Sequence, residues 1–515
     1  MKRLFFCLAV LGVILTGCSK NDDGESDKPN NNGNEQPENP NEPELPELPA
    51  LPDPDDVCSA MDDLNFMAYC YENFDVNKDG KVSVTEANAA KEIYTTSSKW
   101  VSVKGIERFP NIEILSLNGS SITELDLRYN LKLKSISGYS SLLTTVLLPN
   151  TLTSIEKSAF KECASLIEIH FPASLTSIGV NAFYGCSSLT EINFPASLTS
   201  IGGSAFRGCS SLVEIHLSDN LTSIGEYAFS GCSSLTEINF PASLTLIGGS
   251  AFRGCSSLVE IHLSDNLTSI GEYAFSGCSS LTEINFPASL TWIGGSAFSG
   301  CSSLVEIHLP DNLTSIGERA FWSCSSLTEI HLPASLTWIG GSAFSGCSNL
   351  TKINLPDNLT SIGKTAFSGC SSLTEIHFPA SLTSIGEYAF SGCSSLTEIN
   401  LPASLASIGG SAFSGCSSLT EINFPASLTS IGESAFSFCS NLTEIHLPAS
   451  LTSIGEGTFW SCSSLTEVIC YALVPPKLNG FSNSTIENLY VPAESIQAYK
   501  DSSWAIYFKN ILPIE

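Results

Sequence analysis

The sequence has few charged residues, and among these it is poor in positive charge. Only 15% of the 515 residues are charged, and 23 Lys and Arg residues stand against 52 Asp and Glu residues, for a net charge of -29. Nucleic acids and anionic membrane surfaces repel a chain with this balance. We therefore expect no nucleic-acid partner, whereas basic proteins, cations or neutral glycans suit the charge better.

Long hydrophobic runs are also missing. The apolar stretch at 4–15 follows Lys2 and Arg3 and is too short to span a bilayer, and no later segment reaches 18 uninterrupted apolar residues. A basic start followed by a short apolar run is typical of a secretory signal. The run ends in Leu-Thr-Gly-Cys at 15–18, which resembles the lipobox of bacterial lipoproteins.

By this resemblance residues 1–17 are a signal peptide, Cys18 is the lipidated first residue of the mature chain, and this lipid is its only membrane contact. The sequence Ser-Lys-Asn-Asp-Asp-Gly-Glu follows, which is similar to the acidic signal of lipoproteins sent to the outer face of the outer membrane. We expect a lipid-anchored outer-membrane protein that faces the extracellular side. Residues 18–56, rich in Pro, Asn and Glu, are predicted to form a disordered tether.

An acidic loop at 75–86 matches the EF-hand calcium loop. Such loops supply oxygen ligands at positions 1, 3, 5, 7, 9 and 12, and they carry Gly at position 6. Gly80 has this place, and Val82 is apolar where the loop packs inward. The predicted ligands are Asp75, Asn77, Asp79, the Lys81 carbonyl, Ser83 (directly or through water) and Glu86. We expect one structural calcium ion in the segment 57–100, and the alternative is a chance acidic turn.

Helices are expected on both sides of this loop. Leu64, Met67, Tyr71 and Phe74 have the spacing of one helical face before the loop, and residues 87–94 can form the helix after it. The loop resembles one half of a dockerin module, but the second half is missing. We therefore favour a calcium ion that stiffens the start of the repeats.

From residue 163 onward, one 23-residue pattern fills most of the chain. In the unit that begins at Cys186, Leu189, Ile192 and Phe194 occupy the L-x-x-L-x-L positions of leucine-rich repeats, whose periods are 20–29 residues. The pattern returns fourteen times in register. Its Cys residues are Cys163, Cys186, Cys209, Cys232, Cys255, Cys278, Cys301, Cys324, Cys347, Cys370, Cys393, Cys416, Cys439 and Cys462.

The unit resembles the BspA-like type of leucine-rich repeat in its I-x-[FL]-P, L-T-S-I-G and A-F-x-x-C signatures. The resemblance covers about residues 110–515, with irregular repeats at 101–162, regular repeats at 163–465 and a cap of that family's type at 466–515. It implies a cell-surface protein that adheres to host matrix or plasma proteins, or to another cell surface.

Physical considerations favour the same fold. One repeat has a single apolar layer, which is too little to offset the ordering entropy, so the repeats are stable only when stacked. We predict a right-handed leucine-rich-repeat solenoid with a parallel β-sheet on its concave face and a small helical EF-hand segment at its N-terminal end. Ile192 and Phe194 should point inward from a strand that Pro195 ends, and Leu198 and Ile201 should line a second side.

The cysteines could suggest metal or redox chemistry. Each Cys of the repeat has only other Cys residues in the neighbouring layers and no His in its own loop. We therefore interpret this column as free thiols buried as small apolar side chains. Cys58 and Cys70 flank the first expected helix and could form a disulfide in an oxidising compartment, a pairing that the sequence leaves open.

Two polar columns occupy the outward positions of the strands. One carries Glu in thirteen layers and Lys352 in another, and the second carries Asn or His, including all seven histidines, until Ile469. Both columns should lie on one face, where Glu residues about 4.8 Å apart create a negative field that attracts a basic partner. The alternative is a solvated face copied by duplication. The candidate partner-binding residues are Glu191, Glu214, Glu237, Glu260, Glu283, Glu306, His216, His262 and His308.

Trp292 and Trp338 complete the candidate partner-binding set. They replace the Ser of L-T-S-I in alternate layers, as interface anchors or through packing against the next layer. We find no nucleophile–base pair and no phosphate-binding loop, so we expect no catalytic residues and no enzyme. The predicted function is capture of a macromolecular partner through an extended face. The alternatives are a glycan-capturing component of a nutrient uptake system, with Trp as the stacking platform, and a structural spacer.

Overall fold

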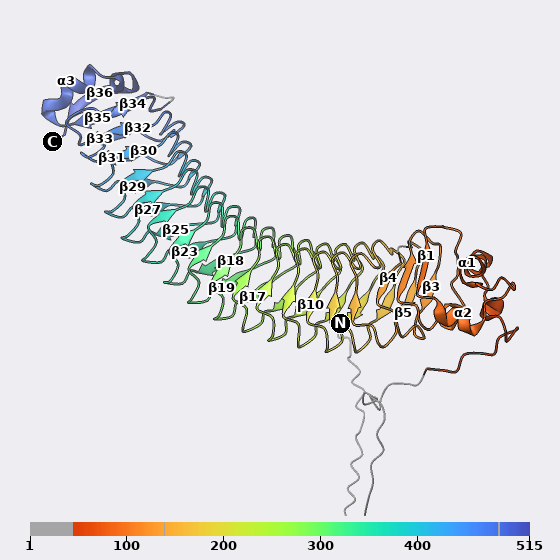
Figure 1. The fold of residues 1–515 in the computed structure, drawn as a ribbon. Coiled ribbons are helices and arrows are strands. Elements are labelled where there is room, and N and C mark those ends of the chain that lie inside the picture. Colours follow the sequence, from red (N-terminus) through yellow and green to blue (C-terminus); the bar gives the residue numbers. More distant parts are fainter. Residues whose placement is uncertain (1–44, 139, 483–484, 515) are drawn as a thin grey trace, which may run out of the picture. The chain divides into compact units, whose positions relative to one another are not determined.

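The chain divides into two units, Met1–Glu47 and Leu48–Glu515. The computed structural model describes residues 45–138, 140–482 and 485–514, so the predicted lipidation site Cys18 and most of the predicted tether lie outside the described residues. The second unit is a solenoid in which short strands of successive repeats lie side by side (Figure 1). No helix in the described ranges is both long and apolar enough to cross a membrane.

The N-terminal part of the solenoid holds two short helices, preceded by the 3-10 turn η1 (Val57–Ala60). Helix α1 (Leu64–Phe74) is capped by Asp63. The Asp63 carboxylate accepts hydrogen bonds from the backbone amides of Asn65 and Phe66 at the start of the helix. The predicted face of α1 is wrong at Leu64, which is 76% exposed, because the helix turns Phe66 and Cys70 into the core instead. Phe66 packs there against Trp100, with ring centroids 4.9 Å apart.

The predicted helix after the loop is present, but its predicted bounds of 87–94 are wrong. Helix α2 (Val84–Ala89) begins earlier, because Ser83 and Glu86 form a reciprocal capping box at its start. It ends before strand β1 (Glu92–Thr95), which buries Ile93 and pairs in parallel with β2 (Ile114–Leu117). The first sheet of the array therefore takes the residues that the EF-hand pattern gives to a helix.

Each turn of the array contributes strands to two rows, which we call row A and row B. All pairings in both rows are parallel and in register, although neighbouring sheets within a row are separated by short breaks. Row A contains β3 (Glu124–Asp126), β5 (Thr145–Leu147), β7 (Glu168–His170), β9 (Glu191–Asn193), β11 (Glu214–His216), β13 (Glu237–Asn239), β15 (Glu260–His262), β17 (Glu283–Asn285), β19 (Glu306–His308), β21 (Glu329–His331), β23 (Lys352–Asn354), β25 (Glu375–His377), β27 (Glu398–Asn400), β29 (Glu421–Asn423), β31 (Glu444–Leu447), β33 (Glu467–Cys470), β35 (Ile486–Val491) and β36 (Phe508–Pro513).

Row B was not predicted as a sheet, because its strands are mostly two residues long and show no alternation of their own. It lies on the side where the sequence places Leu198 and Ile201. After β1 and β2 it contains β4 (Ser135–Ser137), β6 (Ser154–Ile155), β8 (Ser177–Ile178), β10 (Ser200–Ile201), β12 (Ser223–Ile224), β14 (Leu246–Ile247), β16 (Ser269–Ile270), β18 (Trp292–Ile293), β20 (Ser315–Ile316), β22 (Trp338–Ile339), β24 (Ser361–Ile362), β26 (Ser384–Ile385), β28 (Ser407–Ile408), β30 (Ser430–Ile431), β32 (Ser453–Ile454) and β34 (Lys477–Leu478).

The core is a set of side-chain columns that run the length of the array. Leu189, Ile192 and Leu198 are buried in one repeat, and the same positions are buried in the repeats on either side. The Phe residues of the A-F-x-x-C segments form a stack, as in Phe206 and Phe229, whose ring centroids are 5.3 Å apart and whose planes are nearly parallel. Phe194 is buried as predicted, but it lies just beyond β9, which already ends at Asn193.

The cysteines of the repeat are free and buried, as the sequence predicts. From Cys186 onward each thiol donates a hydrogen bond to a Phe carbonyl of the preceding layer, as from Cys232 to Phe206 at 3.4 Å, whereas Cys163 donates to the Gly138 carbonyl at 3.0 Å. Cys58 and Cys70 are also free and buried, and they form a hydrogen bond with each other. They do not flank α1 as expected, because Cys70 lies within the helix.

A compact cap closes the C-terminal end of the array. It is built from β35, the 3-10 turn η3 (Ala493–Ser495), α3 (Ile496–Lys500), the 3-10 turn η4 (Ser503–Tyr507) and β36. Trp504 and Tyr499 are fully buried, and the indole N–H of Trp504 donates to the Pro476 carbonyl at 3.0 Å. Strand β36 is the last strand of row A, and its Lys509 and Pro513 discourage pairing with another strand.

Candidate interaction face

The outward side chains of row A form one continuous polar surface. We call this surface, made by the first and third residues of strands β7 to β31, the polar face. Strand alternation explains it, because the residue between them points inward: Ile238 is buried, while Glu237 and Asn239 are exposed. The strands are in register, so Glu237 lies beside Glu260 and Asn239 lies beside His262. The predicted polar columns therefore do share one exposed face.

The structure divides the predicted partner-binding residues between the two rows. The predicted Glu and His residues lie on the polar face, in strands β9 to β19. Trp292 and Trp338 lie in row B instead, where they are 39% and 44% exposed. The polar residues and the two indoles therefore belong to two different surfaces.

Within each strand of the polar face except β23, which begins with Lys352, the Glu contacts the polar residue two positions on. The His Nε2 atoms lie 2.8–3.5 Å from Glu Oε1, and the Asn Nδ2 atoms donate to Glu Oε1 at 2.7–3.2 Å. These side chains are largely exposed, and exposed pairs of this kind contribute little to stability. The polar residues are therefore not needed to hold the array together.

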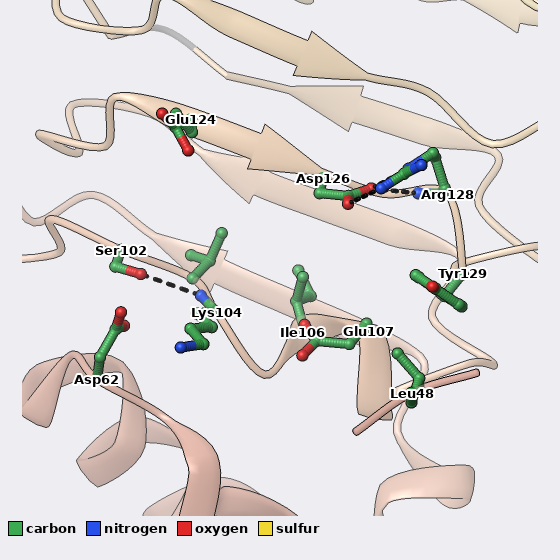
Figure 2. Close-up of a pocket in the computed structure, with 11 residues that line it drawn as sticks. Leu48, Asp62, Ser102, Lys104, Ile106, Glu107, Glu124, Asp126, Arg128 and Tyr129 are labelled. Carbon is green, nitrogen blue, oxygen red and sulfur yellow. Dashed lines mark hydrogen bonds and ion pairs between the residues drawn. The ribbon is translucent and has the colours of Figure 1, made fainter. Parts of the chain in front are cut away.

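A hollow at the N-terminal end of row A extends this surface (Figure 2). It has a volume of about 370 Å³, and its lining includes Glu124 and Asp126 from β3. Burial alone would raise the pKa of the Asp126 carboxyl, but hydrogen bonds from the Arg128 side chain and backbone lower it overall. Figure 2 shows Lys104 and Glu107 across from β3, so the lining is strongly charged. Sequence reasoning missed this hollow, because the irregular repeats hide its register.

Two further hollows involve outward residues of row A. One, of about 310 Å³, lies at β7 and β9, with His170 and Glu191 in its lining. The other, of about 620 Å³, lies at the C-terminal end, with Ile469 and Tyr490 in its lining. The sequence contains a signal for the last one, since Ile469 ends the Asn/His column. We call it the C-terminal hollow.

The predicted calcium loop is closed by its own hydrogen bonds. The Asp75 carboxylate accepts from the backbone amides of Asp79 and Gly80, at 3.2 and 2.9 Å. The Glu86 carboxylate accepts from the amides of Val76 and Ser83, both at 2.9 Å. The hydrogen bonds from Ser83, followed by those from the backbone of Asn77 and Val76, lower the pKa of Glu86, so this carboxyl is charged at neutral pH.

The fit of calcium to this loop is mixed. Carboxylate, amide and carbonyl oxygens are the ligands that calcium prefers, and Val82 is buried as the loop requires. The Lys81 side chain points to Asp53, at 2.9 Å, so it does not oppose the ligand oxygens. However, in the described part of the chain no three His, Cys, Asp or Glu side chains are gathered closely enough to hold a metal ion. Calcium binding therefore stays a prediction.

Comparison with known proteins gives the family. The model of the BspA type leucine-rich repeat region matches residues 134–259, 245–374 and 383–505. No curated protein matches the chain. A leucine-rich repeat protein from Bacteroides ovatus is 33% identical, with a TM-score of 0.61, over 71% of this chain and 88% of that one.

Two other solved structures are similar in sequence. A leucine-rich cell surface protein from Faecalibacterium prausnitzii is 26% identical over 63% of this chain and 87% of its own, with a TM-score of 0.39. A leucine-rich repeat protein from T. pallidum is 30% identical over 36% of this chain and 78% of its own, with a TM-score of 0.30. The family model covers well over half of the sequence, and the two-row solenoid agrees with it. The chain therefore belongs to the BspA-type leucine-rich repeat family.

Proposed function

We propose that this protein captures a basic extracellular protein through the polar face, and that it does so from the cell surface. Leucine-rich-repeat solenoids are typically non-enzymatic, and the sequence predicts no catalytic residue. Both points agree with an interaction role. Host matrix proteins, plasma proteins and proteins of another cell surface are the candidate partners. The proposal concerns the class of partner, a protein with a basic patch.

The observation that supports this proposal is the in-register repetition of exposed carboxylates on the polar face. Glu237 and Glu260 are neighbours in adjacent strands, and the same pairing recurs along the row. Adjacent strands are about 4.8 Å apart, so the like charges repel one another. A basic patch on a partner relieves this repulsion and is steered towards the face, with a rate and affinity that fall as salt increases.

Charge reversal on the polar face tests the proposal. We expect the combined change Glu237→Lys, Glu260→Lys and Glu283→Lys to weaken binding at least tenfold, because it replaces attraction by repulsion in three adjacent strands of the face. The measurement is surface plasmon resonance with the full-length protein in detergent against a panel of matrix and plasma proteins.

A matched control separates the polar face from net charge. Glu226, Glu272 and Glu318 are exposed in the turns that follow the row B strands. Their reversal to Lys changes the net charge of the chain by the same amount and should leave binding nearly unchanged. Equal loss of binding in both triple variants would show that only net charge matters and would overturn the assignment to the polar face.

Anchoring at the outer membrane is a separate part of the proposal. It is supported by the Leu-Thr-Gly-Cys segment at 15–18 and the acidic residues that follow it. We expect Cys18→Ala to leave the protein unlipidated and soluble, because thioether attachment of the lipid requires this thiol. Radiolabelled palmitate incorporation and membrane fractionation measure this, and unchanged partition of the variant into membranes would contradict the anchor.

Glycan capture is a second candidate, which the row B indoles favour. Trp292 and Trp338 lie two strands apart with Ser315 between them, and both are partly exposed. Aromatic rings in such a row offer stacking surfaces to sugar rings. A glycan array with Trp292→Ser and Trp338→Ser tests this candidate, since Ser is the residue of most other layers. A protein that binds neither glycans nor any protein of the panel is a structural spacer.

A further inference from the structure

The polar face changes its chemistry at its C-terminal end. The third residue of the row A strands is His446 in β31, and the residues in register with it are Ile469, Tyr490 and Leu512 in β33, β35 and β36. In the regular repeats this column carries only Asn or His. The outward column thus becomes apolar in three successive strands.

These apolar residues line the C-terminal hollow, which has a volume of about 620 Å³. Tyr471 and Pro513 also line it, and Tyr471 and Leu512 are 43% and 37% exposed. The phenol of Tyr471 contacts His446 Nδ1 at 3.2 Å, which places its ring beside the last His of the polar face. The volume is in the range of ligand-binding pockets, and exposed apolar side chains grouped in a hollow are typical of interaction sites.

Charge continues into the same hollow. Glu467 is the last Glu of the outward Glu column, lies beside Glu444, and lines the hollow. The hollow therefore combines an apolar floor with a carboxylate at the side that joins the polar face. A group that suits both parts is a bulky apolar side chain with a Lys or Arg beside it.

We propose that the C-terminal hollow binds a bulky apolar side chain, such as leucine or phenylalanine, of a protein segment whose neighbouring residues are basic. The basic residues of this segment would follow the polar face, so the proposal rests on the proposed function for that part. Ile469, Leu512 and Pro513 offer no side-chain hydrogen-bonding groups, which favours an apolar side chain over a sugar. Lys509 and Pro513 discourage strand pairing with a second copy of the chain.

Synthetic peptides test this proposal on the full-length protein in detergent. One peptide carries a leucine between runs of lysine, and a matched peptide carries glycine in its place. We expect the leucine peptide to bind roughly tenfold more tightly in calorimetry, because a leucine side chain is removed from water. A variant with Ile469→Asn, Tyr490→Asn and Leu512→Asn should bind both peptides equally, since it restores the amide of the upstream layers.

Two controls keep the test interpretable. Leu246→Ser removes an exposed apolar side chain from row B and should retain the leucine preference. Leu512→Asn alone, in the last strand, serves if the triple variant does not fold, and it should reduce the preference at least threefold. Circular dichroism and thermal unfolding verify the fold of each variant.

The outcomes separate this proposal from the proposed function. Equal binding of the two peptides to the wild type overturns the anchor site, while salt-sensitive binding that reversal of Glu237, Glu260 and Glu283 abolishes still supports the polar face. A leucine preference that survives this charge reversal at unchanged affinity supports the hollow and overturns the polar face. Displacement of the peptide by a neutral oligosaccharide, or dimers that the triple Asn variant abolishes, overturns the assignment to a protein segment.

Discussion

The glycine after each of the row B strands β8 to β32 controls how closely neighbouring turns stack. A Cβ atom on Gly248 would lie 2.7 Å from the Ile224 carbonyl oxygen and 2.8 Å from the Gly225 carbonyl carbon. These neighbours are backbone atoms, which cannot move without separating the layers. A Cβ atom on the following residue, Gly249, would have its nearest neighbour, the Glu272 carbonyl oxygen, at 3.4 Å, and other repeats carry Glu at this position.

This contrast gives a prediction for adjacent glycines. We expect Gly248→Ala to lower the free energy of unfolding by about 1–3 kcal/mol, as overpacking in a core does. Gly249→Ala should change it by less than about 0.5 kcal/mol, since most surface substitutions do. Chemical denaturation gives the global values, and hydrogen exchange shows whether the loss is confined to the neighbouring layers. Equal effects of the two substitutions would contradict the stacking argument.

The buried thiols make the stability of the array depend on pH in the alkaline range. Burial raises the pKa of Cys209 to about 12, from an ordinary value of 9.0, and the other thiols of the column shift in the same direction. The folded pKa lies above the unfolded one, so the folded state keeps its protons to higher pH. The contribution of the buried thiols to the free energy of unfolding is therefore complete below pH 9 and is lost as the pH rises from 9 towards 12.

Thiol alkylation measures this protection directly. Because the thiolate is the reactive form, we expect the native protein to resist iodoacetamide at pH 8 at all cysteines of the repeat. Reaction should become measurable between pH 9 and 12, or at once in denaturant. Val213→Cys places a thiol at an exposed position and should react rapidly at pH 8 in the same sample. Rapid labelling of the native column would show that it is not sealed by burial.

At the scale of elements, the helices around the acidic loop show where a sequence pattern competes with local structure. The Ser-x-x-Glu signal at 83–86 is a capping box, and it predicts the observed start of α2. The EF-hand pattern gives Glu86 to calcium and places the following helix later, at 87–94. The helix bounds predicted from the EF-hand pattern were wrong, because Ile93 lies in strand β1 and is buried in the core.

Calcium would have to compete with the capping box for Glu86. We predict one calcium ion per chain with an affinity near the millimolar concentrations of extracellular fluids, lost in Glu86→Ala because this residue supplies two oxygens. Isothermal titration calorimetry of the full-length protein measures the affinity. Glu72→Ala is a matched control, since Glu72 lies on the exposed side of α1. Absence of calcium-dependent heat in the wild type would make the loop a hydrogen-bonded turn only.

At the scale of the whole molecule, the regular repeats were predictable, whereas the hollows at the two ends were not. The 23-residue period is visible in the spacing of the cysteines, and the buried Ile192 and the outward Glu191 follow from strand alternation. Row B was not predicted, because two-residue strands are too short to show an alternation of apolar and polar residues. The two end hollows escaped it because each depends on register across irregular repeats, although Ile469 marks the C-terminal one in the sequence.

The last prediction concerns the total charge of the outward Glu column, which runs along the polar face and continues to Glu467. Thirteen Glu residues and Lys352 give this stripe a charge of -12, and seven protonated His residues would bring it to -5. Imidazole side chains gain a proton within the physiological range of pH, and every His of the chain contacts the Glu of its own strand. Capture of a basic partner should therefore weaken as the pH falls from 7.5 to 5.5, and also as salt increases at constant pH.

The chain provides its own control for this pH dependence. Asn fills the His position in six other layers, including those next to His216, His262 and His308, so His216→Asn, His262→Asn and His308→Asn should leave the fold and the affinity at pH 7.5 unchanged. The affinity of this variant for lysine-rich peptides, measured by surface plasmon resonance, should fall less between pH 7.5 and 5.5 than that of the wild type. If both proteins bind independently of pH and salt, the stripe is only a solvated strand surface. Trp292 and Trp338 in row B then become the better candidates for partner contact, because they are exposed aromatic residues that lie outside the polar face.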